Sequence, residues 1–228
     1  MKKFSILTII AAVFAANVCL GQEIKDKAQR EGDQSVELQA LTLAWENAVM
    51  GYRTQNPLYL MSAAQLLIDN PSSELQVKKM QEAELKSTGS KEASEIILDP
   101  AKLLEDAKSF AYGDAIVTEM IKEKMKSVSG SRGAVGGPYK LTRRVEANDF
   151  NIYSIRFRSN ELAEIAVIGD SDTDLDLFVF DANDNIIVSD EDYTDRCYVS
   201  WIPKWTGEFK IVVMNRGGVF NRFTILTN

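Results

Sequence analysis

The sequence changes character once, near residue 130, and this change constrains the fold more than any other feature. Residues 33–126 are rich in Ala, Leu, Met, Glu and Lys, which favour helices, and their apolar positions recur at helical spacing. From Tyr139 onward apolar residues alternate with polar ones, which is the period of strands that bury one face. Because the two patterns follow each other in blocks, the sequence predicts a small helical domain followed by an antiparallel β-sandwich.

The helical block carries its own start and stop signals. Asn56-Pro57 and Asp99-Pro100 each place a capping residue before a proline, and Gly113-Asp114 is expected to end one helix and cap the next. The apolar positions from Val36 to Val49 predict a first helix ending near Gly51, and a charged helix is expected over about residues 74–86. The two cap-proline starts lie 43 residues apart. This spacing suits a duplicated helical hairpin of the solenoid type, or a coincidence between two apolar helix faces.

The second block predicts a set of short strands separated by polar turns, as in a two-sheet sandwich. Between the blocks, residues 127–138 (SVSGSRGAVGGP) predict a Gly-rich linker, because a phosphate-binding loop would need a Gly-Lys-Ser/Thr ending before a helix. The expected organisation is a signal peptide over 1–21, a helical domain over 22–126, the linker, and a sandwich over 139–228. The residues expected to face the core of the sandwich are Tyr153, Ile155, Phe157, Ile165, Val167, Leu175, Leu177, Val179, Val199, Trp201, Phe209, Ile211, Val213, Phe223 and Ile225.

The N-terminus has the form of an export signal. Two lysines precede an apolar run over residues 4–16, and small residues near Gly21 offer a cleavage site. The run is shorter than the ~20 apolar residues of a spanning helix, so it predicts no transmembrane segment. Acylation of Cys19 would need a small residue before it, and Val18 is not one. We therefore expect an exported protein, in the periplasm, at the cell surface or outside the cell.

Composition excludes several kinds of chemistry. The chain has no histidine, which rules out Ser-His-Asp and Cys-His catalysis and imidazole metal ligands. Its net charge of −7 argues against nucleic acid, which favours a basic surface. After export only Cys197 would remain, so no intramolecular disulfide can form. Its apolar, alternating surroundings predict a buried inert thiol; a reactive thiol and an intermolecular bridge are the alternatives.

Four segments of the second block occur in the order of a known family. They are Ala147–Tyr153, Asp172–Asn185 (DTDLDLFVFDANDN), Trp201–Phe209 (WIPKWTGEF) and Asn221–Ile225. Together they resemble the bacterial pre-peptidase C-terminal domain, over residues 139–228. The resemblance implies a secreted jelly-roll-like β-sandwich that is an accessory to proteases or other exported enzymes. Some members of the family bind calcium, and some bind collagen or polysaccharide. Residues 22–126 show no such resemblance.

Residues 170–195 form the most acidic part of the chain, with ten Asp or Glu and no Lys or Arg. Such acids repel one another unless they are solvated, screened or bridged by a cation. The pattern argues against an EF-hand loop, because its sixth position needs glycine and here is Leu175. Two alternatives stay open: a solvated acidic rim, or a calcium site. The candidate calcium ligands are Asp170, Asp172, Asp174, Asp181 and Asp184.

The remaining candidate for recognition is Trp205. Trp201 and Trp205 flank Pro203; Trp201 shares the face of Val199 and is expected in the core, whereas Trp205 is either corner packing or a ring that stacks on a sugar. Arg156 and Arg158 are interpreted as an outward strand face.

No residue is predicted to be catalytic, so the expected function is a secreted, non-catalytic binding or accessory protein. Its partner would be a protein or glycan, its helical part would dock a protein, and calcium is the candidate cofactor. The alternatives are a glycosidase-like hydrolase with a carboxylate pair, and a module that aids folding or secretion and binds no ligand.

Overall fold

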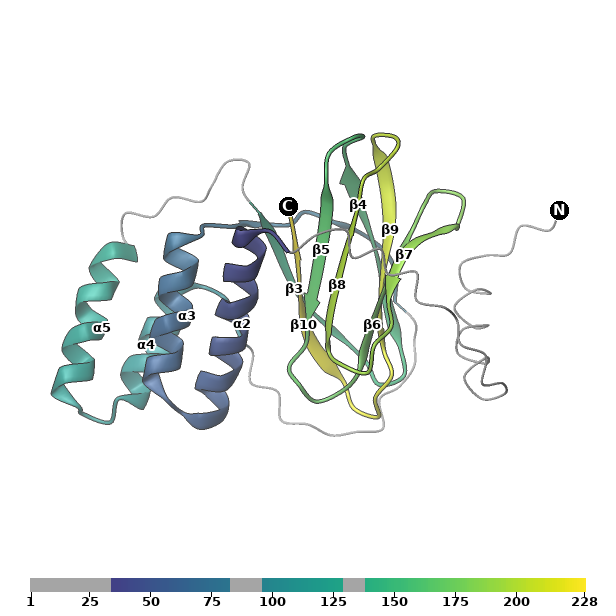
Figure 1. The fold of residues 1–228 in the computed structure, drawn as a ribbon. Coiled ribbons are helices and arrows are strands. Elements are labelled where there is room, and N and C mark those ends of the chain that lie inside the picture. Colours follow the sequence, from purple (N-terminus) through teal and green to yellow (C-terminus); the bar gives the residue numbers. More distant parts are fainter. Residues whose placement is uncertain (1–33, 83–95, 129–137) are drawn as a thin grey trace.

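The computed structural model describes residues 34–82, 96–128 and 138–228, and it confirms the predicted fold class (Figure 1). The predicted signal peptide lies outside these residues, as does most of the predicted linker. The helices are α2 (Val36–Thr54), α3 (Pro57–Asp69), α4 (Pro100–Phe110) and α5 (Ala115–Val128). The strands are β1 (Ser73–Glu74), β2 (Lys78–Glu82), β3 (Tyr139–Val145), β4 (Phe150–Phe157), β5 (Ala163–Ile168), β6 (Leu175–Phe180), β7 (Ile186–Asp190), β8 (Arg196–Trp201), β9 (Gly207–Asn215) and β10 (Asn221–Thr227).

The predicted helix starts are confirmed by hydrogen bonds from the helix N-termini. The Asn56 side chain accepts from the backbone N–H of Leu58 at 2.9 Å, and the Asp99 side chain accepts from that of Lys102 at 2.9 Å. In both helices a proline fills the first position, where no N–H is needed. Asp114 accepts from two N–H groups at the start of α5, and Gly113 before it has a φ of +84°, which glycine adopts without strain.

The first helix is longer than predicted, because Gly51 lies inside it and does not end it. A Cβ at this position would come within 2.5 Å of the Leu60 side chain, so glycine here lets α2 and α3 approach closely. The apolar face is also narrower than expected. Leu38, Leu41 and Trp45 are fully buried, whereas Val36 and Leu43 are exposed.

The charged helix expected over residues 74–86 is wrong as far as residue 82, because the chain forms strands there, and residues 83–86 lie outside the described residues. β1 pairs in parallel with β3, and β2 pairs antiparallel with β4, so each adds a strand to the edge of a sheet. Leu75 is buried in the core of the sandwich and Val77 packs against it, so alternate residues face the core. The helix-favouring residues around them led to the wrong prediction. The hydrogen bonds offered by two open sheet edges outweighed the local preference for a helix.

The strands form two five-stranded sheets, in the orders β1-β3-β10-β5-β8 and β2-β4-β9-β6-β7. From β3 onward the first strand pairs with the last, the second with the last but one, and so on to the β6–β7 hairpin. This is the order of a jelly roll, which the family resemblance implied. Every residue predicted to face the core of the sandwich belongs to its central cluster of buried side chains.

The helices lie in a row beside the first sheet, with α2 next to the strands and α5 farthest away (Figure 1). Ala166, Ile168 and Leu226 project from β5 and β10 into the same buried cluster as the helices. At this interface the Trp45 indole donates to the carbonyl of Gly169 at 2.8 Å. The helices and the sandwich therefore share a core, although the predicted boundaries at residues 126 and 139 stay predictions.

The outer face of the second sheet is apolar over β4, β6 and β9. Its side chains form a buried cluster apart from the other two: Phe150, Ile152, Phe178, Phe180, Val212 and Met214. Among the residues that the structure describes, no helix is both long and apolar enough to cross a membrane.

Candidate binding surfaces

The five candidate calcium ligands fall into two groups that β6 separates. Asp170, Asp172 and Asp174 lie in the loop before this strand, and Asp181 and Asp184 lie in the turn after it. The strand has six residues, so the two groups are about 20 Å apart. Within the described ranges, no three carboxylate or thiol side chains are arranged to hold a metal ion. The set is not one cluster, and calcium binding stays a prediction.

Asp181 has partners in its own hairpin, whereas Asp184 has a partner on β9. One oxygen of Asp181 accepts from the backbone N–H groups of Asn183 and Asn185, and the other accepts from the Asn185 side chain at 2.9 Å. Burial acts to raise the pKa of Asp181, but these hydrogen bonds outweigh it and lower the pKa. Asp184 is paired with Lys210 of β9. Asp181 therefore stabilises the turn, and Asp184 links the turn to β9.

The other three acids lie in the loop before β6, where Arg53 of α2 approaches Asp170 and Asp172. Asp170 accepts from the backbone N–H of Arg222 at 3.0 Å, and Asp172 lies 3.9 Å from the Arg53 guanidinium of α2. The Asp174 carboxyl is half-buried, and one of its oxygens has no hydrogen-bond partner among the described residues. Burial raises the pKa of Asp174, as do the neighbouring carboxylates, while Arg216 acts to lower it.

The repulsion expected within residues 170–195 is relieved by cations from outside this stretch. Arg216 bonds to the buried Asp176, Lys210 to Asp184, and Arg53 lies beside Asp172. Sequence reasoning missed these partners, because each lies on another element and only the topology brings it near.

Cys197 is buried, as predicted, at 3% exposure. Burial, reinforced by the nearby Asp190 and Asp176, holds the pKa of its thiol well above the usual range. A thiol in these surroundings is protonated and a poor nucleophile.

Trp205 lies in the corner between β8 and β9, at the end of the sandwich opposite the loop that holds Asp170, Asp172 and Asp174. Its ring stacks on Phe209, with centroids 5.4 Å apart and planes 16° from parallel, and it is 41% exposed. A Cβ at Gly207 would come within 3.0 Å of this ring, so glycine lets the indole fold back. Phe209 in turn contacts Trp201, which is in the core as predicted. Trp205 thus has one face fixed by the core, while part of its surface is open to solvent.

The loop between β4 and β5 lies against this corner. The backbone N–H of Asn160 donates to the carbonyl of Pro203 at 2.9 Å, and that of Ser159 donates to the Thr206 hydroxyl at 2.9 Å. Two apolar side chains of these loops are exposed beside the tryptophan corner, Leu162 at 44% and Ile202 at 55%. We call Leu162, Ile202 and Trp205 the aromatic end. The sequence indicated only the tryptophan, because a pattern of apolar residues does not distinguish an exposed Leu or Ile from a buried one.

A pocket of about 350 Å³ opens beside the aromatic end. It runs from the end of β4 to the first residue of β3 and the last residue of the chain. The described residues that line it are Tyr139, Arg156, Phe157, Arg158, Glu161, Leu162, Ala163 and Asn228. Asn228 fixes its rim: the side chain donates to the carbonyl of Leu162 at 2.7 Å and accepts from the N–H of Glu164 at 3.0 Å.

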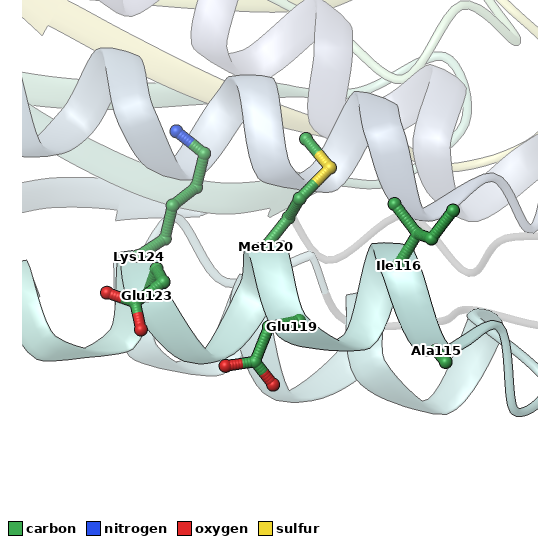
Figure 2. Close-up of a pocket in the computed structure, with 6 residues that line it drawn as sticks. All are labelled: Ala115, Ile116, Glu119, Met120, Glu123 and Lys124. Carbon is green, nitrogen blue, oxygen red and sulfur yellow. The ribbon is translucent and has the colours of Figure 1, made fainter.

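A second, shallow hollow of about 680 Å³ lies along α5 (Figure 2). Ile116, Met120 and Lys124 point to one side of the helix, and Glu119 and Glu123 lie on the other side. Ile116 is 76% exposed and Met120 47% exposed, so this face of the outermost helix is apolar. The docking of a protein by the helical part stays a prediction.

Comparisons with known proteins give similar solved structures, which cover about two fifths of this chain in the three matches below. The sequence matches no protein-family model and no curated protein. The structure is similar to the pre-peptidase C-terminal domain of a Bacillus anthracis collagenase, at 11% identity and a TM-score of 0.34, over 38% of this chain and 86% of the other. It is also similar to the Aeromonas hydrophila periplasmic inhibitor of g-type lysozyme, at 12% identity and a TM-score of 0.33, over 43% and 91%.

A third similar structure is a carbohydrate-binding module of a Cellvibrio mixtus lichenase in complex with cellotriose. It shares 14% identity at a TM-score of 0.25, over 41% of this chain and 87% of the module. At TM-scores this low, the likeness carries no argument about ligand or activity. Membership of the pre-peptidase C-terminal family likewise stays a prediction.

Proposed function

We propose that this is an exported, non-catalytic binding protein, and that its jelly roll binds carbohydrate through the aromatic end. The observation that carries the proposal is the geometry of Trp205. Its ring is held on one side by Phe209 and is 41% exposed, so little conformational entropy is lost when a ligand covers it. A flat ring of this kind can stack on the apolar face of a sugar.

Two further features support a binding role over catalysis. The chain has no histidine, and Cys197, the cysteine that the structure describes, is buried with a raised pKa. The aromatic end is also built from loops on a rigid sandwich, which is where binding residues of such folds usually lie. Export is supported by the basic and apolar N-terminus.

The test is a glycan array probed with the chain, followed by affinity measurements on the best-bound glycan. Trp205→Ala is expected to weaken binding by about tenfold or more, as truncation of a central aromatic contact does. Trp205→Phe keeps a flat ring and should lose less. The matched control is Tyr193→Ala, which removes a 96% exposed aromatic at the other end of β8 and should leave affinity unchanged.

The proposal fails if the chain binds no glycan, or if Trp205→Ala binds as tightly as the original chain. Binding to a protein array alone, lost in Trp205→Ala, would replace carbohydrate by a protein as the ligand. Loss of hydrolytic activity on substitution of two neighbouring acids would instead favour the carboxylate-pair hydrolase. Because Trp205 packs on Phe209, each variant is compared with the original chain by circular dichroism before binding is measured.

A further inference from the structure

The pocket beside the aromatic end brings two arginines together on an acidic chain. Arg156 and Arg158 both line it, together with Glu161 and with Asn228, at which this sequence ends with a carboxylate. The chain as a whole carries a net charge of −7. Two guanidinium groups therefore line one small pocket of an acidic chain.

The two arginine side chains are also available to a ligand. Arg156 lies 3.8 Å from Glu208 and Arg158 lies 3.8 Å from Glu161, and both distances exceed those of a hydrogen bond. Their side chains are 66% and 77% exposed. Glu208 is held by the Ser154 hydroxyl at 2.6 Å, which ties its carboxylate to the strand. Exposed ion pairs of this length contribute little, so a ligand can replace them at small cost.

β2 pairs with only part of β4, and the residues of β4 beyond this pairing line the pocket. The pairing of β2 with β4 runs from Asn151 only to Ser154, so this edge of β4 is open at Arg156 among the described strands. Phe157, Leu162 and Ala163 supply apolar walls, while the rim holds the polar Tyr139 and Asn228. A few polar groups within apolar walls are the usual composition of a small-molecule site.

We propose that this pocket binds a carboxylate group of the ligand, so that the carbohydrate recognised at the aromatic end is an acidic one that contains uronic acid. The inference rests on the proposed function and deepens it. A guanidinium matches a planar carboxylate with two parallel hydrogen bonds, which gives both affinity and orientation. The two features are close enough to act on one chain of sugars, because Phe157 of the pocket pairs with Gly207, two residues after Trp205.

The test uses two polymers with the same sugar backbone, polygalacturonate and its methyl ester, in which a methyl group replaces the charge of each carboxylate. The original chain is expected to prefer polygalacturonate, and Arg156→Gln with Arg158→Gln should weaken that binding by about tenfold or more. Binding to the methyl ester should not change. The control carries Arg143→Gln with Lys108→Gln, which removes the same charge from exposed residues outside the pocket lining and should keep the preference.

The outcomes separate this inference from the function on which it rests. Equal affinity for the two polymers, or a preference that survives the double arginine substitution, would overturn the carboxylate pocket and leave the aromatic end intact. If the chain binds neither polymer, free galacturonate is titrated while the amide resonances of residues 156–163 are followed by NMR. Shifts that the arginine substitutions abolish would support the pocket by itself, and their absence would overturn it.

Discussion

Asp176 shows how a single acid is used within the acidic stretch. It lies on β6 between Leu175 and Leu177, which face the core, so its own side chain points to the outer face of the sheet. It is 2% exposed and bonds to Arg216 in the turn after β9. Burial raises the pKa of Asp176 to about 6, although Arg216 acts in the opposite direction. The folded protein therefore binds this proton more tightly than the unfolded chain does.

We predict that Asp176→Asn changes how stability depends on pH. Between the ordinary carboxyl pKa of 3.8 and about 6, the folded chain holds a proton that the unfolded chain has released. The stability that this proton contributes is present at low pH and is lost as the pH rises through 6. Relative to the asparagine variant, the original chain should lose about 2–3 kcal/mol between pH 4 and pH 7. Urea unfolding of both proteins across this range measures the difference; parallel curves would contradict the prediction.

Sequence reasoning could place such acids in the chain but not in space. It named Asp181 as a candidate calcium ligand, yet the contacts of Asp181 with Asn183 and Asn185 depend on how tightly the hairpin turns. Trp205 could be singled out because a tryptophan in a polar turn is unusual. Its stacking on Phe209 depends on the glycine at position 207, which sequence reasoning read only as a turn residue.

At the scale of elements, the sequence was most informative where a pattern was long. The alternation in β4, β6 and β9 predicted the central core, because each strand buries one face over several residues. It failed at β1 and β2, where a short segment with helix-favouring residues completes two sheet edges. It also could not find which outer strand face meets the helices, because Ala166 and Leu226 occupy positions that alternation assigns to solvent.

We predict that Trp45→Phe loosens the contact of α2 with the sandwich. The substitution removes the hydrogen bond to the Gly169 carbonyl and leaves a small gap, because Trp45 is fully buried. A lost buried hydrogen bond costs about 1–3 kcal/mol, so the midpoint of urea unfolding should fall accordingly. Leu43→Ala on the same helix is the control; its side chain is 46% exposed, and the change should cost about 0.5 kcal/mol or less. Equal effects of the two substitutions would show that the bond to Gly169 is unimportant.

At the scale of the whole molecule, the helices and the jelly roll are joined by more than a linker. Leu226 of β10 is fully buried in the cluster that also holds Trp45 and Leu104. The backbone N–H before α2 donates to the buried Glu164 of β5, and Arg196 of β8 pairs with Glu46 of α2. β1 and β2, which lie between α3 and α4 in sequence, belong to the sheets. Two regions that the sequence distinguishes clearly are therefore coupled through one interface.

We predict that this coupling makes the helices and the sandwich unfold in one transition. Calorimetry should give a single peak whose calorimetric and van't Hoff enthalpies agree. Leu226→Ala, a change within the sandwich, should lower stability by about 2–5 kcal/mol and shift the loss of helical circular dichroism by the same amount. Ile187→Ala, at a side chain 37% exposed on β7, is the control. Two separate peaks, or a helical signal that does not respond to Leu226→Ala, would show that the blocks fold independently and that their shared cluster adds little to stability.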